Sequence, residues 1–478
     1  MNDLRILIAR LKWPSTSTRW WTMQELAAKL GDETVRRETE SALLQFLHSR
    51  KLEAEVVEVL CIFWMASKSF GYSPLVELTK SIPKHSLLSN LLTDSLGLSA
   101  CSGDTSLNEV PEDFEIPDDF NGVQGVDLPR IFRTALHRLE TYPGLPFVHQ
   151  MAFAWTENRA AYSEAPYQGD LRHFSQSQGD GFTGSLSSRT SLRIISAYLR
   201  TLAIAKQSWG MPSGLAAEKS LLALPVHPTL AFLRPKRPLW FPTSADFDGN
   251  SKSEEEAFRA LIARVESAHP GDELISFSSP ITISTERCVE VSLVKWSQDP
   301  GSKVVDGHLG THLASFWTQC GVLTSSAPYP LSTTTIVSPS KHEELLDKDS
   351  QAWPLAGTID FDRIGYLQHD LYPSRLFLPA MPGSQKITPH NEHLEIKVKD
   401  QVVANLFYWN AGWGSVRPKP FGGNCGTALI SRGKTYRKDL GFQVRSLRAF
   451  YLWQIRTLHR SGIFEEFKET IATGTVFV

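Results

Sequence analysis

Residues 394–409 constrain the fold more than any other stretch, because they combine two strand patterns around a short break. Residues 394–399 alternate apolar and charged side chains with a period of two, as in a strand with one buried face. After Asp400 and Gln401, residues 402–409 are apolar on both faces. The two runs together predict a β-hairpin whose second strand is the more deeply buried.

The first half of the chain has helical patterns instead. Residues 22–25 form a capping-box pattern, which predicts a helix that starts there and ends at Gly31. Apolar side chains at helical spacing predict further helices at about 33–48, 53–66, 188–209 and 253–265. We therefore expect an α+β protein: a helical N-terminal half, a mixed α/β region, and a C-terminal β-hairpin followed by an amphipathic basic helix.

The chain has 478 residues, which is longer than a single hydrophobic core usually spans, so several domains are expected. Residues 102–127 contain eight acidic residues and no basic one, and their interspersed prolines and glycine predict a linker. The expected division is a helical domain at 1–100, an acidic linker at 101–128, a helical domain at 129–245, a mixed α/β domain at 246–384 and a basic hairpin-helix region at 385–478.

Positive charge is concentrated near the carboxyl end. Residues 386–460 hold thirteen Lys and Arg against four acids, a net charge of +9 in a chain whose total is −2. The rest of the chain is therefore acidic. Such asymmetry indicates a surface for a polyanion, or one that docks on acidic parts of the same chain.

Residues 444–460 are predicted to form the basic helix. At 100° per residue, five apolar side chains fall on one arc, namely Val444, Leu447, Tyr451, Ile455 and Leu458. Five basic side chains cluster on the opposite side, namely Arg445, Arg448, Arg456, His459 and Arg460. Gly462 is placed to end the helix. The loop before it, rich in glycine and proline, contains Trp413, Arg417 and Lys419.

A positive helix face beside exposed aromatic rings is typical of proteins that bind nucleic-acid backbones, where cations neutralise phosphates and rings stack on bases. We interpret the chain as a non-enzymatic, nucleic-acid-associated subunit of a larger protein assembly. Trp409 and Trp413 are the candidate stacking platforms. The predicted phosphate contacts are Arg417, Lys419, Lys434, Arg437, Lys438, Arg445, Arg448, Arg456 and Arg460.

Two enzymatic alternatives remain open. Glu395-Ile396-Lys397 on a predicted strand, with Asp360 or Asp362 upstream, resembles the acid plus Glu-x-Lys core of PD-(D/E)xK nucleases. The resemblance implies that the carboxylates hold a divalent metal and that Lys397 positions the attacking water. Cys425, in a glycine-flanked loop, could instead be a thiol nucleophile if the fold brought His390, His393 or His459 close to it.

Other sequence features narrow the class of protein. No apolar run reaches the roughly 18 residues that span a bilayer, and the five cysteines are scattered, so we expect a cytoplasmic protein with reduced thiols. Nucleotide-binding fingerprints and zinc cysteine arrays are missing, so no cofactor or metal is expected. A pure protein-interaction subunit without nucleic-acid binding is the third alternative.

Overall fold

The structure is a computed structural model of the chain. It describes residues 2–13, 15–98, 107–118, 120, 138–141, 144–158, 189–248, 253–284, 286–298, 325–326, 331–337, 352–360, 365–368, 375–380, 383–410, 425–433, 448–462 and 465–478.

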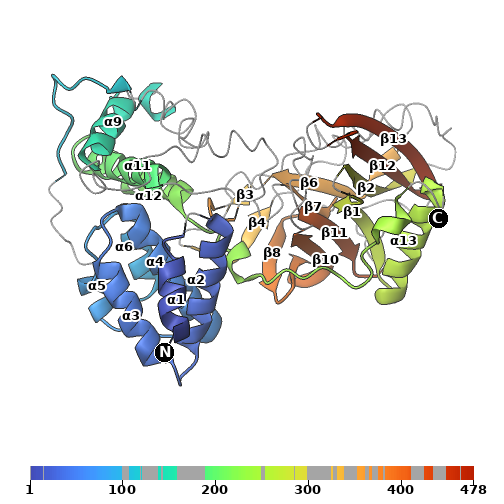
Figure 1. The fold of residues 1–478 in the computed structure, drawn as a ribbon, viewed down its shortest axis with the longest axis horizontal. Helices are drawn as coiled ribbons and strands as arrows, with labels where there is room; N and C mark the ends of the chain where they lie inside the picture. Colours follow the sequence, from blue (N-terminus) through green and yellow to red (C-terminus); the bar gives the residue numbers. More distant parts are fainter. Residues whose placement is uncertain are drawn as a thin grey trace.

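Helices occupy the first half of the described chain and gather at one end of the molecule (Figure 1). They are α1 (Asn2–Arg10), α2 (Thr16–Gly31), α3 (Arg36–His48), α4 (Glu53–Phe70), α5 (Glu77–Lys80), α6 (Leu87–Ser95), α9 (Phe147–Glu157), α11 (Arg189–Gln207) and α12 (Ser213–Ser220). The short 3₁₀ helices are η2 (Leu221–Ala223), η3 (Leu230–Phe232) and η4 (Ser244–Asp246). One more helix, α13 (Glu254–Ala268), lies at the opposite end, beside the sheet (Figure 1).

Strands follow α13. They are β1 (Glu273–Thr282), β2 (Arg287–Gln298), β3 (Ser325–Ser326), β4 (Thr335–Val337), β5 (Ala352–Pro354), β6 (Ala356–Asp360), β7 (Arg375–Pro379), β8 (Gln385–His390), β9 (His393–Val398), β10 (Gln401–Asn410), β11 (Cys425–Ser431), β12 (Arg448–His459) and β13 (Lys468–Phe477). Among the described residues, eleven of them form one sheet with the path β13-β12-β2-β1-β11-β10-β9-β8-β4-β3, in which β5 also pairs with β2. β6 and β7 form a separate two-stranded sheet.

The fold is therefore α+β, as the sequence predicted. The predicted helices at 188–209 and 253–265 correspond to α11 and α13, and Ser253 forms the capping box of α13. The N-terminal prediction was less accurate. α2 starts at Thr16 with Ser15 as its N-cap, so Thr22 is a buried residue inside the helix and not its first cap.

The central helix of the N-terminal half is α4. Every residue from Glu53 to Ala66 is buried, because α2, α6 and α11 all pack around it. Its buried acids are neutralised by arginines from neighbouring segments, including Glu58 by Arg19 and Glu53 by Arg200. Gly71 ends the helix in the left-handed conformation, at φ 64°. None of the described helices is long and apolar enough to cross a membrane.

Two hydrophobic clusters cover the two faces of the large sheet. One is continuous with the helical core and includes Leu406, Phe450 and Leu452 from the sheet. The other packs under α13 and includes Phe277, Trp409 and Tyr451. Because the side chains alternate between these clusters, β10 and β12 are buried on both faces.

The predicted basic helix at 444–460 is wrong, because residues 448–459 form β12, a strand between β2 and β13. Residues 449–453 are continuously apolar and rich in aromatic residues, and Ile455 and Leu458 follow, so helical spacing and strand spacing both fit this segment. The segment forms a strand because the sheet buries both of its faces. The predicted hairpin at 394–409 is confirmed as β9 and β10, in antiparallel register. The proposed domain boundaries stay predictions.

Candidate functional site

A group of polar side chains lies on one face of β8, β9 and β10, close to the β8–β9 turn. In antiparallel pairing His390 is opposite His393, and Thr388 is opposite Glu395. β10 continues these rows with Asn405 opposite Glu395. Directly paired residues share a face, so these side chains and Lys397 form one surface, which we call the hairpin patch: Thr388, His390, His393, Glu395, Lys397 and Asn405.

Two histidines and one carboxylate meet within this patch. One potential ligand atom from each of His390, His393 and Glu395 lies within 4.8 Å of the other two. The two imidazole rings are 5.2 Å apart between centroids. The short turn that joins β8 to β9 produces this arrangement, and Asn391 accommodates its positive φ of 51°.

Lys397 and Phe407 hold the patch in place from two sides. Lys397 Nζ lies 2.8 Å from Glu395 Oε2. The Phe407 ring packs 5.1 Å from that of His393 and 5.4 Å from that of His269. The first contact fixes the carboxylate and the second limits rotation of the imidazole.

Three buried polar atoms of the patch have no hydrogen-bond partner among the described residues: His393 Nε2, Asn405 Oδ1 and Thr388 Oγ1. Buried polar atoms in native proteins are usually paired, by water or a ligand where protein groups are lacking. Their concentration on neighbouring strands indicates a place where a bound group would be stabilised.

Electrostatics set the protonation states of the patch. The hydrogen bond from Lys397 lowers the pKa of Glu395, with help from the charge of Lys397. Burial lowers the pKa of His393, and the neighbouring His390 and Arg432 lower it further, against the opposing effect of the Glu395 carboxylate. At neutral pH the patch therefore offers an ionised carboxylate and a neutral imidazole.

A second basic segment, Arg234–Pro238, runs beside the β8–β9 turn. The Arg234 backbone N–H donates to the Asn391 carbonyl at 3.3 Å, and Lys236 Nζ lies 3.7 Å from Glu392 Oε1. The guanidinium of Arg237 lies 5.2 Å from the centroid of the Phe241 ring. Arg234, Lys236, Arg237 and Arg432 are all exposed.

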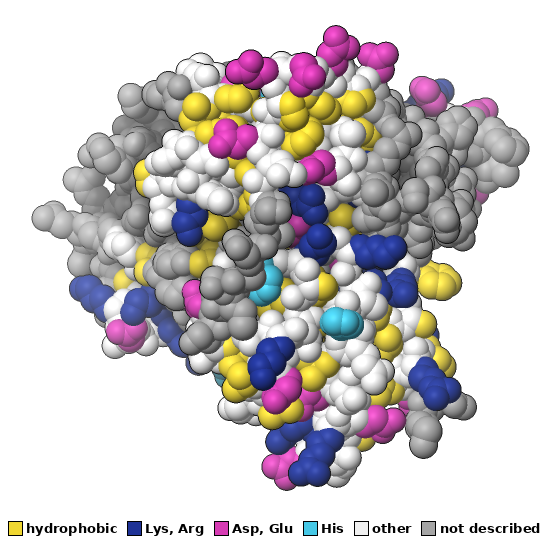
Figure 2. All heavy atoms as spheres, turned by 90° about the vertical axis from the view of Figure 1, so that its left-hand side faces the viewer, with side chains coloured by type: hydrophobic (Ala, Val, Ile, Leu, Met, Phe, Trp, Pro, Cys, Tyr) yellow, Lys and Arg dark blue, Asp and Glu magenta, His cyan; other side chains and the backbone are white. Residues whose placement is uncertain are grey.

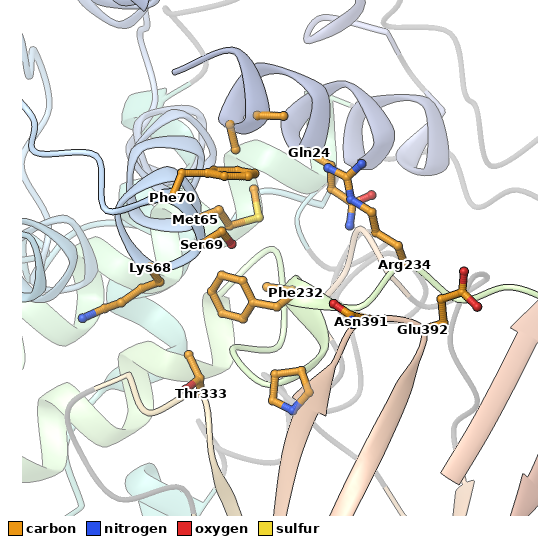
Figure 3. Close-up of a pocket in the computed structure, with 14 residues that line it drawn as sticks. Gln24, Met65, Lys68, Ser69, Phe70, Phe232, Arg234, Thr333, Asn391 and Glu392 are labelled. Carbon is orange, nitrogen blue, oxygen red and sulfur yellow. The ribbon is translucent and has the colours of Figure 1, made fainter. Parts of the chain in front are cut away.

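A pocket of about 670 Å³ opens between the helical half and this turn. Figure 3 shows Phe232 in its centre, with Met65 and Phe70 of α4 on one side and Asn391 of the turn on the other. Lys68 and Arg234 contribute cations to its lining. The turn thus lies between this pocket and the hairpin patch.

The structure changes the interpretation of several predicted site residues. Trp409 is only 1% exposed, packed against Trp240, Phe241 and Phe277, so it cannot stack on a base in this fold. Arg456 is also buried, in ion pairs with acids of β2 and β13.

The predicted cations of β12 do not gather in one place. Arg448 and Arg460 lie at its opposite ends, roughly 40 Å apart at about 3.3 Å per residue. Each packs over an aromatic ring, that of Phe477 or Phe467. The β12 cations therefore form no single surface.

The remaining candidates have mixed outcomes. Cys425 is buried at the start of β11, which does not suit a nucleophile. Asp360 ends β6, in a different sheet from Glu395. Outside the described residues lie Asp362, Trp413, Arg417, Lys419, Lys434, Arg437, Lys438 and Arg445.

Sequence reasoning considered His390 and His393 only as possible partners of Cys425. It missed that they lie together beside Glu395, because the strand that carries His390 was not predicted. The signal was present in His390-Asn391-Glu392-His393, where two histidines flank a turn-forming pair directly before the predicted hairpin. No protein family, curated protein or solved structure matches this chain.

Proposed function

We propose that this protein is a nucleic-acid-associated subunit that contacts phosphate groups through the hairpin patch and the basic segment Arg234–Pro238. One observation carries the proposal. The basic segment Arg234–Pro238 meets the β8–β9 turn, about 150 residues later in the sequence, through the contacts of Arg234 with Asn391 and Lys236 with Glu392.

The charge balance at this place supports phosphate binding. Arg234, Arg237 and Arg432 are exposed cations. Two acids, Glu392 and Glu395, each already lie beside a lysine. Guanidinium groups are suited to phosphate because they donate two parallel hydrogen bonds.

The test is a fluorescence-anisotropy titration with labelled single-stranded DNA, duplex DNA and RNA at several salt concentrations. The double variant Arg234→Glu/Arg237→Glu should bind at least about 10-fold more weakly. Its log affinity should depend less steeply on log salt, by roughly 0.7 to 0.9 for each lost phosphate contact.

The matched control is Lys80→Glu/Lys206→Glu, which changes the net charge equally at exposed positions on α5 and α11. Figure 1 shows α5 on the far side of the helical half from the hairpin. The control should bind within about twofold of wild type. Equal loss in both variants, or no binding by wild type at low salt, would contradict the proposal.

A second candidate, the metal-dependent nuclease, is favoured by one specific observation: Glu395 and Lys397 share a face and touch. Mg²⁺-dependent cleavage that disappears in Glu395→Ala would support it. Equal residual activity in the two proteins would exclude it.

The protein-interaction alternative draws support from the surface of the helical end. Figure 2 shows Lys and Arg interspersed with Asp and Glu there, with acidic side chains along the upper margin. A surface of mixed sign fits a protein partner better than a polyanion. Failure of the wild-type protein to bind any nucleic acid would favour this alternative.

A further inference from the structure

The two histidines and the glutamate of the hairpin patch together form a set of metal-type donors, a role separate from phosphate binding by the exposed arginines beside the patch. His390 and His393 are a cross-strand pair, and Glu395 lies two residues further along the same face of β9. Imidazole and carboxylate donors that converge on one point are typical of transition-metal sites.

We propose that His390, His393 and Glu395 bind a divalent first-row transition ion, with Zn²⁺ the best match. Two imidazoles and one carboxylate fill three positions of a tetrahedral ion, which leaves a fourth open to water or to a phosphate oxygen. Mg²⁺ is a poorer match because it prefers oxygen ligands in octahedral geometry.

The spacing of the donors is close to what such an ion requires. Ligands at about 2.0 to 2.2 Å from Zn²⁺ are roughly 3.3 Å from one another. The three donor atoms lie within 4.8 Å of one another, so binding requires an inward shift of about an ångström. His390 is exposed and can make this shift by rotation of its side chain.

The surroundings suit a bound cation. His393 Nε2 is buried and has no hydrogen-bond partner among the residues that the structure describes. Lys397 binds only one oxygen of Glu395 in the contact at 2.8 Å, so the other oxygen can ligate the ion. Lys397 then remains an outer partner of the carboxylate, as is common around metal ligands.

The test is calorimetric titration of the full chain with Zn²⁺ alone, without nucleic acid. One ion should bind per chain at this site. His390→Ala and Glu395→Gln should each weaken that binding by at least about 100-fold, since the loss of an outer-shell partner alone costs 10- to 100-fold. Tetrahedral Co²⁺ bands in the visible spectrum should disappear in the same variants.

Matched controls separate this site from adventitious binding. His48→Ala, at the exposed end of α3, and Glu25→Gln, on the exposed face of α2, should leave Zn²⁺ affinity unchanged. Circular dichroism checks that each variant folds. Wild-type affinity in both His390→Ala and Glu395→Gln would overturn the proposal, as would no Zn²⁺ binding by wild type. Neither result depends on whether the protein binds nucleic acid.

Discussion

Replacement of Arg456 separates a structural role from a phosphate-binding one. Its Nη1 lies 2.9 Å from Glu290 Oε2 on β2, and its Nη2 lies 2.7 Å from Glu469 Oε2 on β13. Arg456 therefore joins three adjacent strands. The side chains of Arg456 and Glu290 are 7% and 8% exposed, whereas Glu469 is 39% exposed.

Arg456→Ala should lower the free energy of unfolding by about 3 to 5 kcal/mol, because it leaves the Glu290 carboxylate buried without its partner. The pair with the more exposed Glu469 should add little to this cost. The double variant Arg456→Met/Glu290→Leu should regain most of the loss, since it removes both buried charges and keeps apolar volume.

Urea unfolding followed by tryptophan fluorescence measures the effect. With a slope of about 3 kcal/mol per M, the midpoint of Arg456→Ala should fall by roughly 1 M or more. Nucleic-acid affinity, measured where the variant is still folded, should not change. A loss of stability below about 1 kcal/mol together with weakened nucleic-acid binding would refute the structural role.

Two further predictions test the core beside the hairpin patch. Gly426→Ala should lower the free energy of unfolding by about 1 to 3 kcal/mol, because the new Cβ would lie 2.2 Å from Trp409 Nε1. The control is Gly214→Ala, whose new Cβ would meet no atom within 4 Å and should change the free energy of unfolding by less than about 1 kcal/mol. The urea midpoints of the two variants are compared with that of wild type. Burial lowers the pKa of His269, and its Nε2 accepts a hydrogen bond from Trp240. The unfolded state therefore binds the proton more tightly, so this stabilisation should be present above about pH 6.5 and be lost as the pH falls through the folded-state pKa. The urea midpoint of wild type should fall more than that of His269→Gln between pH 8 and 5.5, and equal falls would contradict this.

The sequence predicted those parts of the fold whose patterns are local. α13 has an apolar stripe on one side only, and β9 alternates strictly, so each of these two patterns allowed one interpretation. α11 has apolar residues at helical spacing over 19 residues, which is too long for a typical strand. β12 is different, because the apolar run at 449–453, followed by Ile455 and Leu458, fits a helix or a strand equally well. The strand forms because β12 pairs with β2, more than 150 residues earlier in the chain. Nothing in the local sequence of β12 indicates that long-range pairing.

The same reasoning explains what could be predicted of the site. The hairpin at 394–409 placed Glu395 and Lys397 on one face in advance. The position of Arg234–Pro238 could not be predicted, because its contacts with Asn391 and Glu392 join segments far apart in the chain. The count of charges along the sequence thus indicated a basic region, but the prediction placed several of its phosphate contacts on the segment that forms β12, where Arg456 is buried.

Photo-crosslinking to a nucleic acid tests the location of the binding surface most directly. A single-stranded oligonucleotide with photoreactive bases would be irradiated with the full chain at low salt, and the linked peptides identified by mass spectrometry. The account predicts crosslinks in residues 234–241 and 386–405. Crosslinks confined to β12 or to the helices α1 to α6, with none at the β8–β9 turn, would contradict it.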